Sequence, residues 1–416
     1  MKKIVTVLMA SMIAGAVMTS ATHAQSPTGV GYSPGAAFDK ISWKSFIEVV
    51  TPAPSPNPNG SLTFETWATD AETFDAKTNP PVWPSGASEA RNEKRFQRTF
   101  LGFHRPMGLK ALVDDNGVPV PCSPPADAAA GNFPTPASAK PPTNCLAEEV
   151  RRNKPAFDYI VNNNLYSASG LQANFPSKQA VEFPQSSDLK KAGVEIKIDW
   201  VPVNTVVTWL NKNLKQPVNA AFVKKNYFIT QQKDGTAYAM VSMHISIKDR
   251  PNWLWATFEH QMNPGRCDTM GCYDKFGMPA SLAAIPPVAT ANTQYPKCSS
   301  KSPALVAMFK GLPAVWKNYC LKDTQIDYVS TQAKTKGQPV LNGDSVVERI
   351  LAGVPIAQSS CISCHAYAAF SSKGCVASNN PGINNPAPIG TVTPQPGQKQ
   401  YDFVWGLITM PNSVCQ

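Results

Sequence analysis

The sequence predicts an α+β fold rich in β-structure, with an antiparallel sheet body, Pro/Cys-rich loops and a short helical segment near the C-terminus. Three observations lead to this prediction. Apolar and polar residues alternate over several stretches between residues 194 and 260, as in half-buried strands. Helical spacing is confined to short stretches. The chain has 39 prolines, which gather in segments without either period and therefore indicate loops.

The first part of the chain predicts two short helices. Phe38, Ile41 and Phe46 recur at helical spacing, so we expect an amphipathic helix over residues 38–50. A second helix is expected in the latter half of the stretch 148–166, where apolar residues again share one face. Between the two helices, residues 62–67 alternate loosely like a strand.

The middle of the chain predicts the sheet. The stretch 194–203 opens with strict alternation of apolar and polar residues. The stretches 225–231 and 236–247 flank a Lys-Asp-Gly turn signal, which indicates a hairpin. Residues 253–260 follow a proline and predict a further strand. We therefore expect an antiparallel sheet of at least four strands.

The first 24 residues are typical of a signal peptide. Lys2 and Lys3 precede an uncharged apolar run, and Thr22-His23-Ala24 offers small residues for cleavage before Gln25. The run is shorter than the roughly 20 residues that span a bilayer, and no later stretch is long and apolar enough. The sequence predicts an exported protein, periplasmic or secreted, with no membrane span.

The ten cysteines fall into two groups. Two belong to a C-x-x-C-H motif, and the other eight predict disulfides, because an even number in an exported chain is typical of a bridged fold. Crossed pairing among the middle four is an alternative to local pairing. Local pairing would join Cys122 to Cys145, Cys267 to Cys272, Cys298 to Cys320, and Cys375 to Cys415.

The C-x-x-C-H motif comprises Cys361, Cys364 and His365 and is the attachment signature of a c-type haem. On a helix, these three residues share one face, so both thiols can reach one haem and the imidazole can bind its iron as the proximal ligand. The alternative is a redox C-x-x-C, which does not need the histidine and is typical of a thioredoxin-like βαβ setting. We predict one covalent haem c, with a β-rich body over residues 25–340 and a haem c attachment segment over 341–416.

The sixth iron ligand is less well indicated by the sequence. Met410 precedes Pro411 in an expected loop that could present its thioether to the iron, although a packed C-terminal side chain is the plainer interpretation. His260 and His244 are lower-ranked alternatives, since histidines on strands are more often hydrogen-bonded core groups. On a regular strand, Met240, Ser242 and His244 would share one face.

The net charge of +10 narrows the choice of partners. Two of these charges belong to the leader, and no run of lysine and arginine stands out, so we do not expect nucleic-acid binding. The basic balance favours an acidic redox partner or an anionic surface, and a generally solvated basic surface explains it equally well. The sequence also lacks G-x-S-x-G, H-E-x-x-H and P-loop motifs.

Several short segments run through nearly all of the mature chain. They are I-S-W-K-S-F, F-E-T-W-A-T-D, V-R-R-N-K-P-A-F-D-Y-I, V-E-I-K-I-D-W, M-H-I-S-I-K, W-A-T-F-E-H, C-I-S-C-H and D-F-V-W-G-L. In these segments the chain resembles large, exported, single-haem c-type cytochrome family proteins of proteobacteria, whose physiological role is largely unassigned. The resemblance implies haem c bound through Cys361, Cys364 and His365.

Two classes of function follow from these expectations. An iron with two protein ligands would make the chain an electron-transfer protein with a transient redox partner. An iron with an open or weakly held position would make it a haem enzyme, peroxidase- or oxygenase-like, with His260, Glu259 or His244 as acid–base groups, or a haem-based sensor. The sequence favours electron transfer over catalysis, because no acid–base pair lies near the motif in the sequence.

Overall fold

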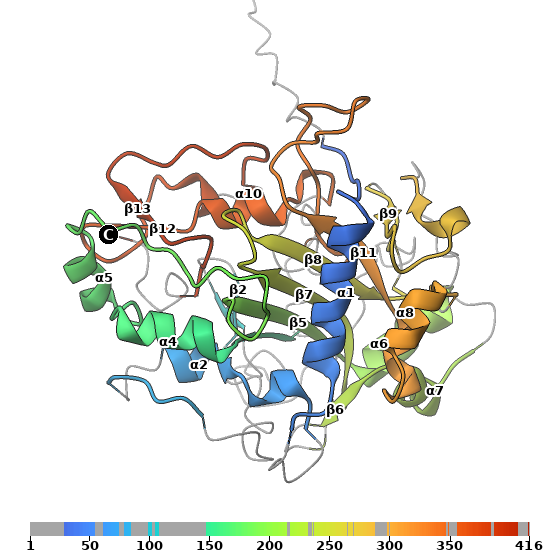
Figure 1. Ribbon diagram of the computed structural model, residues 1–416. Helices are drawn as coiled ribbons and strands as arrows, with labels where there is room; N and C mark the ends of the chain where they lie inside the picture. Colours follow the sequence, from blue (N-terminus) through green and yellow to red (C-terminus); the bar gives the residue numbers. More distant parts are fainter. Residues whose placement is uncertain are drawn as a thin grey trace, which may run out of the picture.

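The computed structural model describes most of the chain from residue 29 onward, including the motif at 361–365 (Figure 1). Residues 1–24, which the sequence predicts to be a signal peptide, lie outside the described part, as do Met410, Cys122 and Cys145. The described residues are 29–54, 61–74, 79–84, 99–101, 105–107, 147–213, 217–231, 235, 237–263, 265–268, 270–287, 298, 300–346, 348, 356–383, 387–406 and 415.

The molecule is built on one seven-stranded sheet whose neighbouring strands are all antiparallel, as the sequence predicts. The strand order is β1-β4-β5-β7-β8-β11, and β6 also pairs with β7. These strands span Ala68–Thr69 (β1), Ala147–Arg152 (β4), Val194–Pro202 (β5), Ile229–Gln231 (β6), Ala237–Ile247 (β7), Leu254–His260 (β8) and Tyr319–Gln325 (β11).

Smaller elements surround the sheet (Figure 1). Three two-stranded ribbons pair Thr99–Leu101 (β2) with Arg105–Met107 (β3), Cys272–Tyr273 (β9) with Ala284–Ile285 (β10), and Ala369–Ser371 (β12) with Gln398–Gln400 (β13). The α-helices are Ala36–Val50 (α1), Asp70–Thr73 (α2), Lys154–Asn162 (α4), Ala168–Asn174 (α5), Val203–Asn213 (α6), Ala220–Asn226 (α7), Pro303–Met308 (α8) and Cys361–Ala366 (α10). Short 3₁₀ helices lie at Thr63–Thr66, Ala280–Leu282, Ala314–Asn318, Ile356–Gln358 and Pro381–Ile383.

The predicted elements are largely present with shifted ends. Helix α1 and strands β5 and β8 match their predicted stretches within two residues. The predicted hairpin is formed by β6 and β7, but α7 takes the start of its first stretch. Helix α4 begins after Asn153, whose side-chain oxygen accepts a hydrogen bond from the Ala156 amide and so caps the helix. The first half of the 148–166 stretch is strand β4, which the sequence did not indicate.

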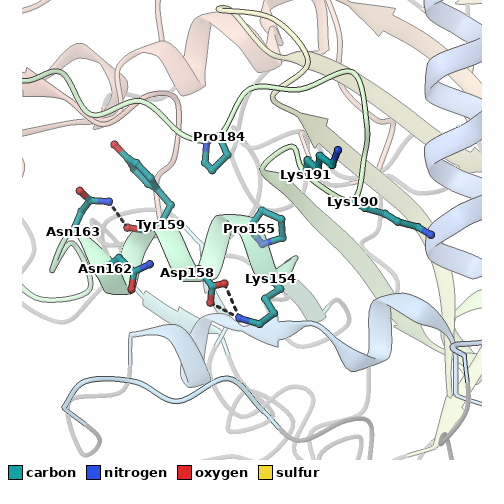
Figure 2. Close-up of a pocket in the computed structure, with 9 residues that line it drawn as sticks. All are labelled: Lys154, Pro155, Asp158, Tyr159, Asn162, Asn163, Pro184, Lys190 and Lys191. Atoms are coloured by element: carbon teal, nitrogen blue, oxygen red, sulfur yellow. Dashed lines mark hydrogen bonds and ion pairs between the residues drawn. The ribbon is translucent and has the colours of Figure 1, made fainter.

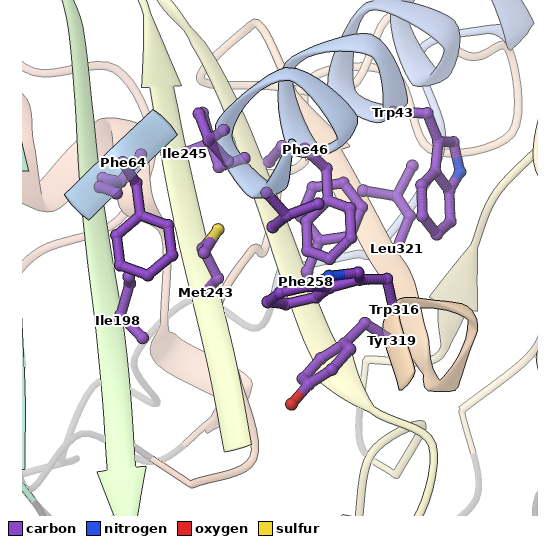
Figure 3. Packing of buried hydrophobic residues seen from close by; sticks show 14 of the residues in the cluster. Trp43, Phe46, Phe64, Ile198, Met243, Ile245, Phe258, Trp316, Tyr319 and Leu321 are labelled. Atoms are coloured by element: carbon purple, nitrogen blue, oxygen red, sulfur yellow. The ribbon is translucent and has the colours of Figure 1, made fainter. Parts of the chain in front are cut away.

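One face of the sheet is apolar and lies under α1 (Figure 3). Alternate residues of the central strands point to this face, including Ile198 of β5, Met243 of β7 and Phe258 of β8. Phe258 stacks on Phe46 of α1 with ring centroids 4.5 Å apart and meets Trp43 edge-on at 4.9 Å. This layer forms the largest of the hydrophobic clusters and gives the fold its main core.

The opposite face of the same strands is polar. It carries Asp199 of β5, Ser242 and His244 of β7, and Thr257 and Glu259 of β8, all of them buried. These residues are buried because the C-terminal part of the chain covers them, as the contacts of residues 344, 345 and 365 show. The sheet therefore has an apolar layer on one side and a hydrogen-bonded layer on the other.

The expectation that Met240 shares a face with Ser242 and His244 is wrong. Asp199 pairs with Ser242, but the next residue of β5, Trp200, pairs with Met240, so β7 contains one extra residue at this point. Such a bulge reverses the alternation, and Met240 lies in the apolar cluster with Met243.

Three of the predicted disulfides are present and follow the local pairing. They join Cys267 to Cys272, Cys298 to Cys320, and Cys375 to Cys415. The fourth predicted pair falls outside the described residues. Among the helices that the structure describes, none is both long and apolar enough to cross a bilayer.

Candidate functional site

Helix α10 carries the Cys–His motif and is held in place by a side chain from the sheet. Gln325, at the end of β11, accepts a hydrogen bond from the Ile362 amide at 3.2 Å and donates one to the Ser360 hydroxyl at 2.9 Å. The amide at the start of a helix lacks a partner within the helix, and Gln325 supplies one. The Ser363 hydroxyl is bonded to both the amide and the carbonyl of Gly390.

The motif residues share the more accessible face of α10. Cys361 and His365 are half-buried and Cys364 is exposed, whereas Ile362, Ser363 and Ala366 are buried against the protein. Ile362, Ser363 and Ala366 thus anchor the helix, and the side chains of Cys361, Cys364 and His365 lie together on its other side, as the spacing predicts.

The imidazole of His365 is oriented by two contacts. Its Nδ1 lies 2.7 Å from the carbonyl oxygen of Phe403, and because a carbonyl only accepts, Nδ1 carries the proton. Its ring lies against the indole of Trp255, with centroids 4.6 Å apart. Burial lowers the pKa of His365 to about 4. The imidazole is therefore neutral at pH 7, and its Nε2 is the nitrogen with a lone pair for a metal.

The carbonyl of Phe403 belongs to a turn with unusual backbone angles. Asp402 and Phe403 have φ values of 45° and 70°, in the left-handed region that residues other than glycine rarely adopt. The carboxylate of Asp402 accepts hydrogen bonds from the Lys248 ammonium and the Phe183 amide, both at 2.7 Å. A buried ion pair therefore holds the turn that orients His365.

The motif thiols are protonated at neutral pH. Burial raises the pKa of Cys361 well above its ordinary range. The pKa of Cys364 is raised as well, because its thiol group is desolvated although the residue as a whole is exposed. Reactive cysteines of redox C-x-x-C motifs have lowered pKa values instead. The setting also differs from a thioredoxin-like one, since α10 lies against an antiparallel sheet. Both observations disfavour the redox C-x-x-C interpretation.

His260 does not lie with the motif. It is fully buried on the face of β8 opposite to Thr257 and Glu259, and its ring stacks on Tyr227 at 3.5 Å between centroids. Its Nδ1 accepts a hydrogen bond from the Met262 amide, so its Nε2 carries the proton, which it donates to the carbonyl of Asn226. Both nitrogens are used, and burial lowers the pKa of His260 to about 3.

His244, in contrast, lies on the motif side of the sheet. Its Nε2 is 2.7 Å from the Asp344 carboxylate and its Nδ1 is 3.2 Å from the Thr257 hydroxyl. The third acid–base candidate, Glu259, accepts hydrogen bonds from the Lys322 ammonium, from both the amide and the hydroxyl of Ser345, and from the Asn263 amide group.

The donor set of α10 fits a covalently attached haem. Cys361 and Cys364 are the described cysteines without a disulfide, and they lie on the same face as His365, whose Nδ1 is anchored to a carbonyl. Thioether attachment needs two such thiols beside one axial imidazole. Met410 lies outside the described residues, so its role as sixth ligand stays a prediction.

A surface depression elsewhere on the molecule is lined by three lysines (Figure 2). It lies along α4 and shares no residue with the motif. Lys154 is paired with Asp158 at 2.6 Å, and Lys191 lies 3.8 Å from Asp188. Because these charges are exposed and mostly paired, the depression by itself indicates no specific ligand.

Sequence reasoning found the motif but missed the residues that position it. Trp255, Gln325, Asp402 and Phe403 carry no recognisable pattern in the sequence, and each acts through a contact with a residue far along the chain. In a strand over residues 253–260, Trp255 shares a face with Thr257 and Glu259, and this alternation is the one sequence signal that bears on Trp255.

No protein-family model matches the chain, and no curated protein or solved structure matches it either.

Proposed function

We propose that this chain is an exported c-type cytochrome, periplasmic or secreted, that transfers electrons through one covalently bound haem c. The observation that carries the proposal is the arrangement of α10. Cys361, Cys364 and His365 share its accessible face, and the Phe403 carbonyl binds Nδ1 of His365, which leaves Nε2 for iron. The predicted signal peptide and the resemblance to single-haem c-type cytochromes support the same conclusion.

Each nearby residue has a role under this proposal. Cys361 and Cys364 would hold the haem through thioethers, and His365 would bind the iron. Trp255 packs against the imidazole, and the turn at Asp402 and Phe403 keeps it in one orientation. When bound, the haem supplies a one-electron iron couple, whose potential depends on the ligands and their hydrogen bonds.

Electron transfer is favoured over catalysis because all three acid–base candidates are already hydrogen-bonded, His244 to Asp344 and Thr257. Both nitrogens of His260 are hydrogen-bonded on the other side of the sheet, and Glu259 is paired with Lys322. A peroxidase- or oxygenase-like enzyme would need such a group available at the reacting centre. The proposed carrier has Met410 as the sixth ligand and an acidic redox protein as its partner.

Haem attachment is tested by expressing the full chain with a haem c maturation system and extracting the denatured protein with acidic solvent. We expect the colour and the mass of one haem to stay with the polypeptide, and to be lost when Cys361→Ser and Cys364→Ser are combined. The matched control combines Cys375→Ser with Cys415→Ser, which removes two cysteines of a disulfide and should leave the haem attached. Wild-type protein that gives up all its colour to the solvent would overturn the proposal.

The carrier and enzyme versions are separated by carbon monoxide. A six-coordinate carrier should show a low-spin spectrum that carbon monoxide leaves unchanged, whereas rapid binding would favour an enzyme or a sensor. Met410→Ala should open the iron to carbon monoxide. An unchanged spectrum in that variant would remove Met410 as the ligand.

A further inference from the structure

A second group of metal-ligating side chains lies on the polar face of the sheet, on the same side as the motif. Asp199 of β5, His244 of β7 and Asp344 each offer one ligand atom, and these atoms all lie within 4.8 Å of one another. All three residues are buried. We propose that this cluster binds one divalent transition-metal ion, distinct from a haem iron and independent of whether haem is attached.

The sheet brings two of the three residues together, and a long-range contact of Ser345 with the sheet brings the third. Asp199 lies opposite Ser242 in the β5–β7 ladder, and His244 follows two residues later on the same face. Asp344 comes from a different part of the chain. The neighbouring Ser345 binds Glu259 of β8 through its hydroxyl, at 2.5 Å, and through its amide, at 3.1 Å. This contact fixes the position of Asp344 above the sheet.

Each of the three candidate ligands also has an outer partner. The Ser242 hydroxyl donates to Oδ2 of Asp199 at 2.5 Å, and the Val346 amide donates to Oδ1 of Asp344 at 2.7 Å. The Thr257 hydroxyl lies 3.2 Å from Nδ1 of His244. Metal ligands in proteins are typically oriented by such outer hydrogen bonds, and a histidine bound through Nε2 would donate its Nδ1 proton to Thr257.

The donor set selects the class of ion. One imidazole nitrogen and two carboxylate oxygens suit Zn²⁺, Mn²⁺ or Fe²⁺. Ca²⁺ and Mg²⁺ take oxygen ligands, so the imidazole argues against them. Three protein ligands from three separate segments would also tie those segments to one another.

The ion would strengthen the attachment of the motif to the sheet. Asp344 belongs to a short segment in which the carbonyl of Asn342 accepts a hydrogen bond from the Ser359 hydroxyl, two residues before Cys361. The Asn342 amide in turn donates to the carbonyl of Ser359. A metal bound by Asp344, Asp199 and His244 would therefore hold the segment 342–344, which is hydrogen-bonded to the residues before α10, against β5 and β7.

The test uses the full-length chain treated with a chelator and then titrated with Zn²⁺, Mn²⁺ or Ca²⁺ by calorimetry. Haem iron is counted separately from its absorbance. The variant that combines Cys361→Ser with Cys364→Ser is titrated in parallel, because motif thiols that carry no haem would also bind Zn²⁺. We expect one equivalent of Zn²⁺ or Mn²⁺ to bind and to raise the unfolding temperature, with no such effect from Ca²⁺. Hydrogen exchange in residues 340–346 should slow when the ion binds.

Variants assign the binding to the cluster. His244→Gln should abolish the heat of Zn²⁺ binding. Thr257→Val should weaken Zn²⁺ binding by about 10–100-fold, because it removes the hydrogen bond to Nδ1 of His244. Asp188→Asn, at an exposed carboxylate, is the control and should bind as the wild type does. Wild-type protein that shows neither a binding heat nor a higher unfolding temperature with millimolar Zn²⁺ would overturn the inference. Undiminished binding in a folded His244→Gln variant would do so too.

Discussion

The two faces of the central sheet are held by different kinds of interaction. On the α1 side, Phe258 and its neighbours pack as interlocking apolar side chains. On the motif side, the buried polar and charged side chains of the central strands have particular polar partners, as Glu259 has in Lys322 and Ser345. Apolar packing stabilises a fold without fixing the orientation of the packed groups closely, whereas hydrogen bonds require defined distances and angles. We infer that the first face mainly provides stability and the second mainly provides position.

The largest expected effect is on the apolar face. Phe258→Ala removes a fully buried ring between Trp43 and Phe46, and it should lower the free energy of unfolding by about 3–5 kcal/mol. Urea unfolding measures the loss. Val306→Ala, at a side chain that is 46% exposed, should change stability by less than about 0.5 kcal/mol. Equal losses in the two variants would contradict the role given to this face.

The next largest effect concerns the ion pair on the polar face. Lys322→Met leaves the Glu259 carboxylate buried without its cation, and it should cost about 3 kcal/mol, because Ser345 and Asn263 still hydrogen-bond that carboxylate. Adding Glu259→Gln removes the uncompensated charge, so the double variant should unfold at higher urea than Lys322→Met alone. A double variant that is no more stable than the single one would show that charge is not the cause.

The third prediction concerns the response to acid. Burial lowers the pKa of His260 to about 3, against about 6.5 in an unfolded chain, so below pH 6.5 the unfolded state binds a proton that the folded state does not. The contribution of neutral His260 to the free energy of unfolding is complete above pH 6.5, and it falls by about 1.4 kcal/mol for each pH unit below that value. Urea unfolding at several pH values should show a shallower acid loss in His260→Gln. Parallel curves for the two proteins would contradict this assignment.

The smallest predicted effect on stability is at the turn that orients His365. Asp402→Asn removes the charge paired with Lys248 and should cost about 1–2 kcal/mol, while hydrogen exchange in residues 401–405 becomes faster. The same substitution at the exposed pair of Asp188 and Lys191 serves as the control and should cost less than about 0.5 kcal/mol. Unchanged exchange at residues 401–405 would mean that other contacts hold the turn.

The local sequence pattern was sufficient to predict the helices and strands whose apolar residues recur with a strong period. Alternation in β5 and β8 and helical spacing in α1 predicted strands and a helix that are present. Strand β4 was missed because its Glu149 and Arg151 are charged, yet both are buried and paired with each other at 2.6 Å. The bulge in β7 was missed for a related reason: a one-residue change of register depends on the neighbouring strand.

The sequence by itself determined the spacing of Cys361, Cys364 and His365 and the strongly periodic strands. It left local and crossed disulfide pairing open, and the three described bridges follow the local pairing. These features depend on residues close together in the chain. Only the tertiary structure decided which face of the sheet lies under the motif, and that Phe403 orients His365. It alone also placed Asp344 beside Asp199 and His244. The physical reason is that each of these contacts joins segments far apart in sequence, whose approach depends on the packing of the whole sheet.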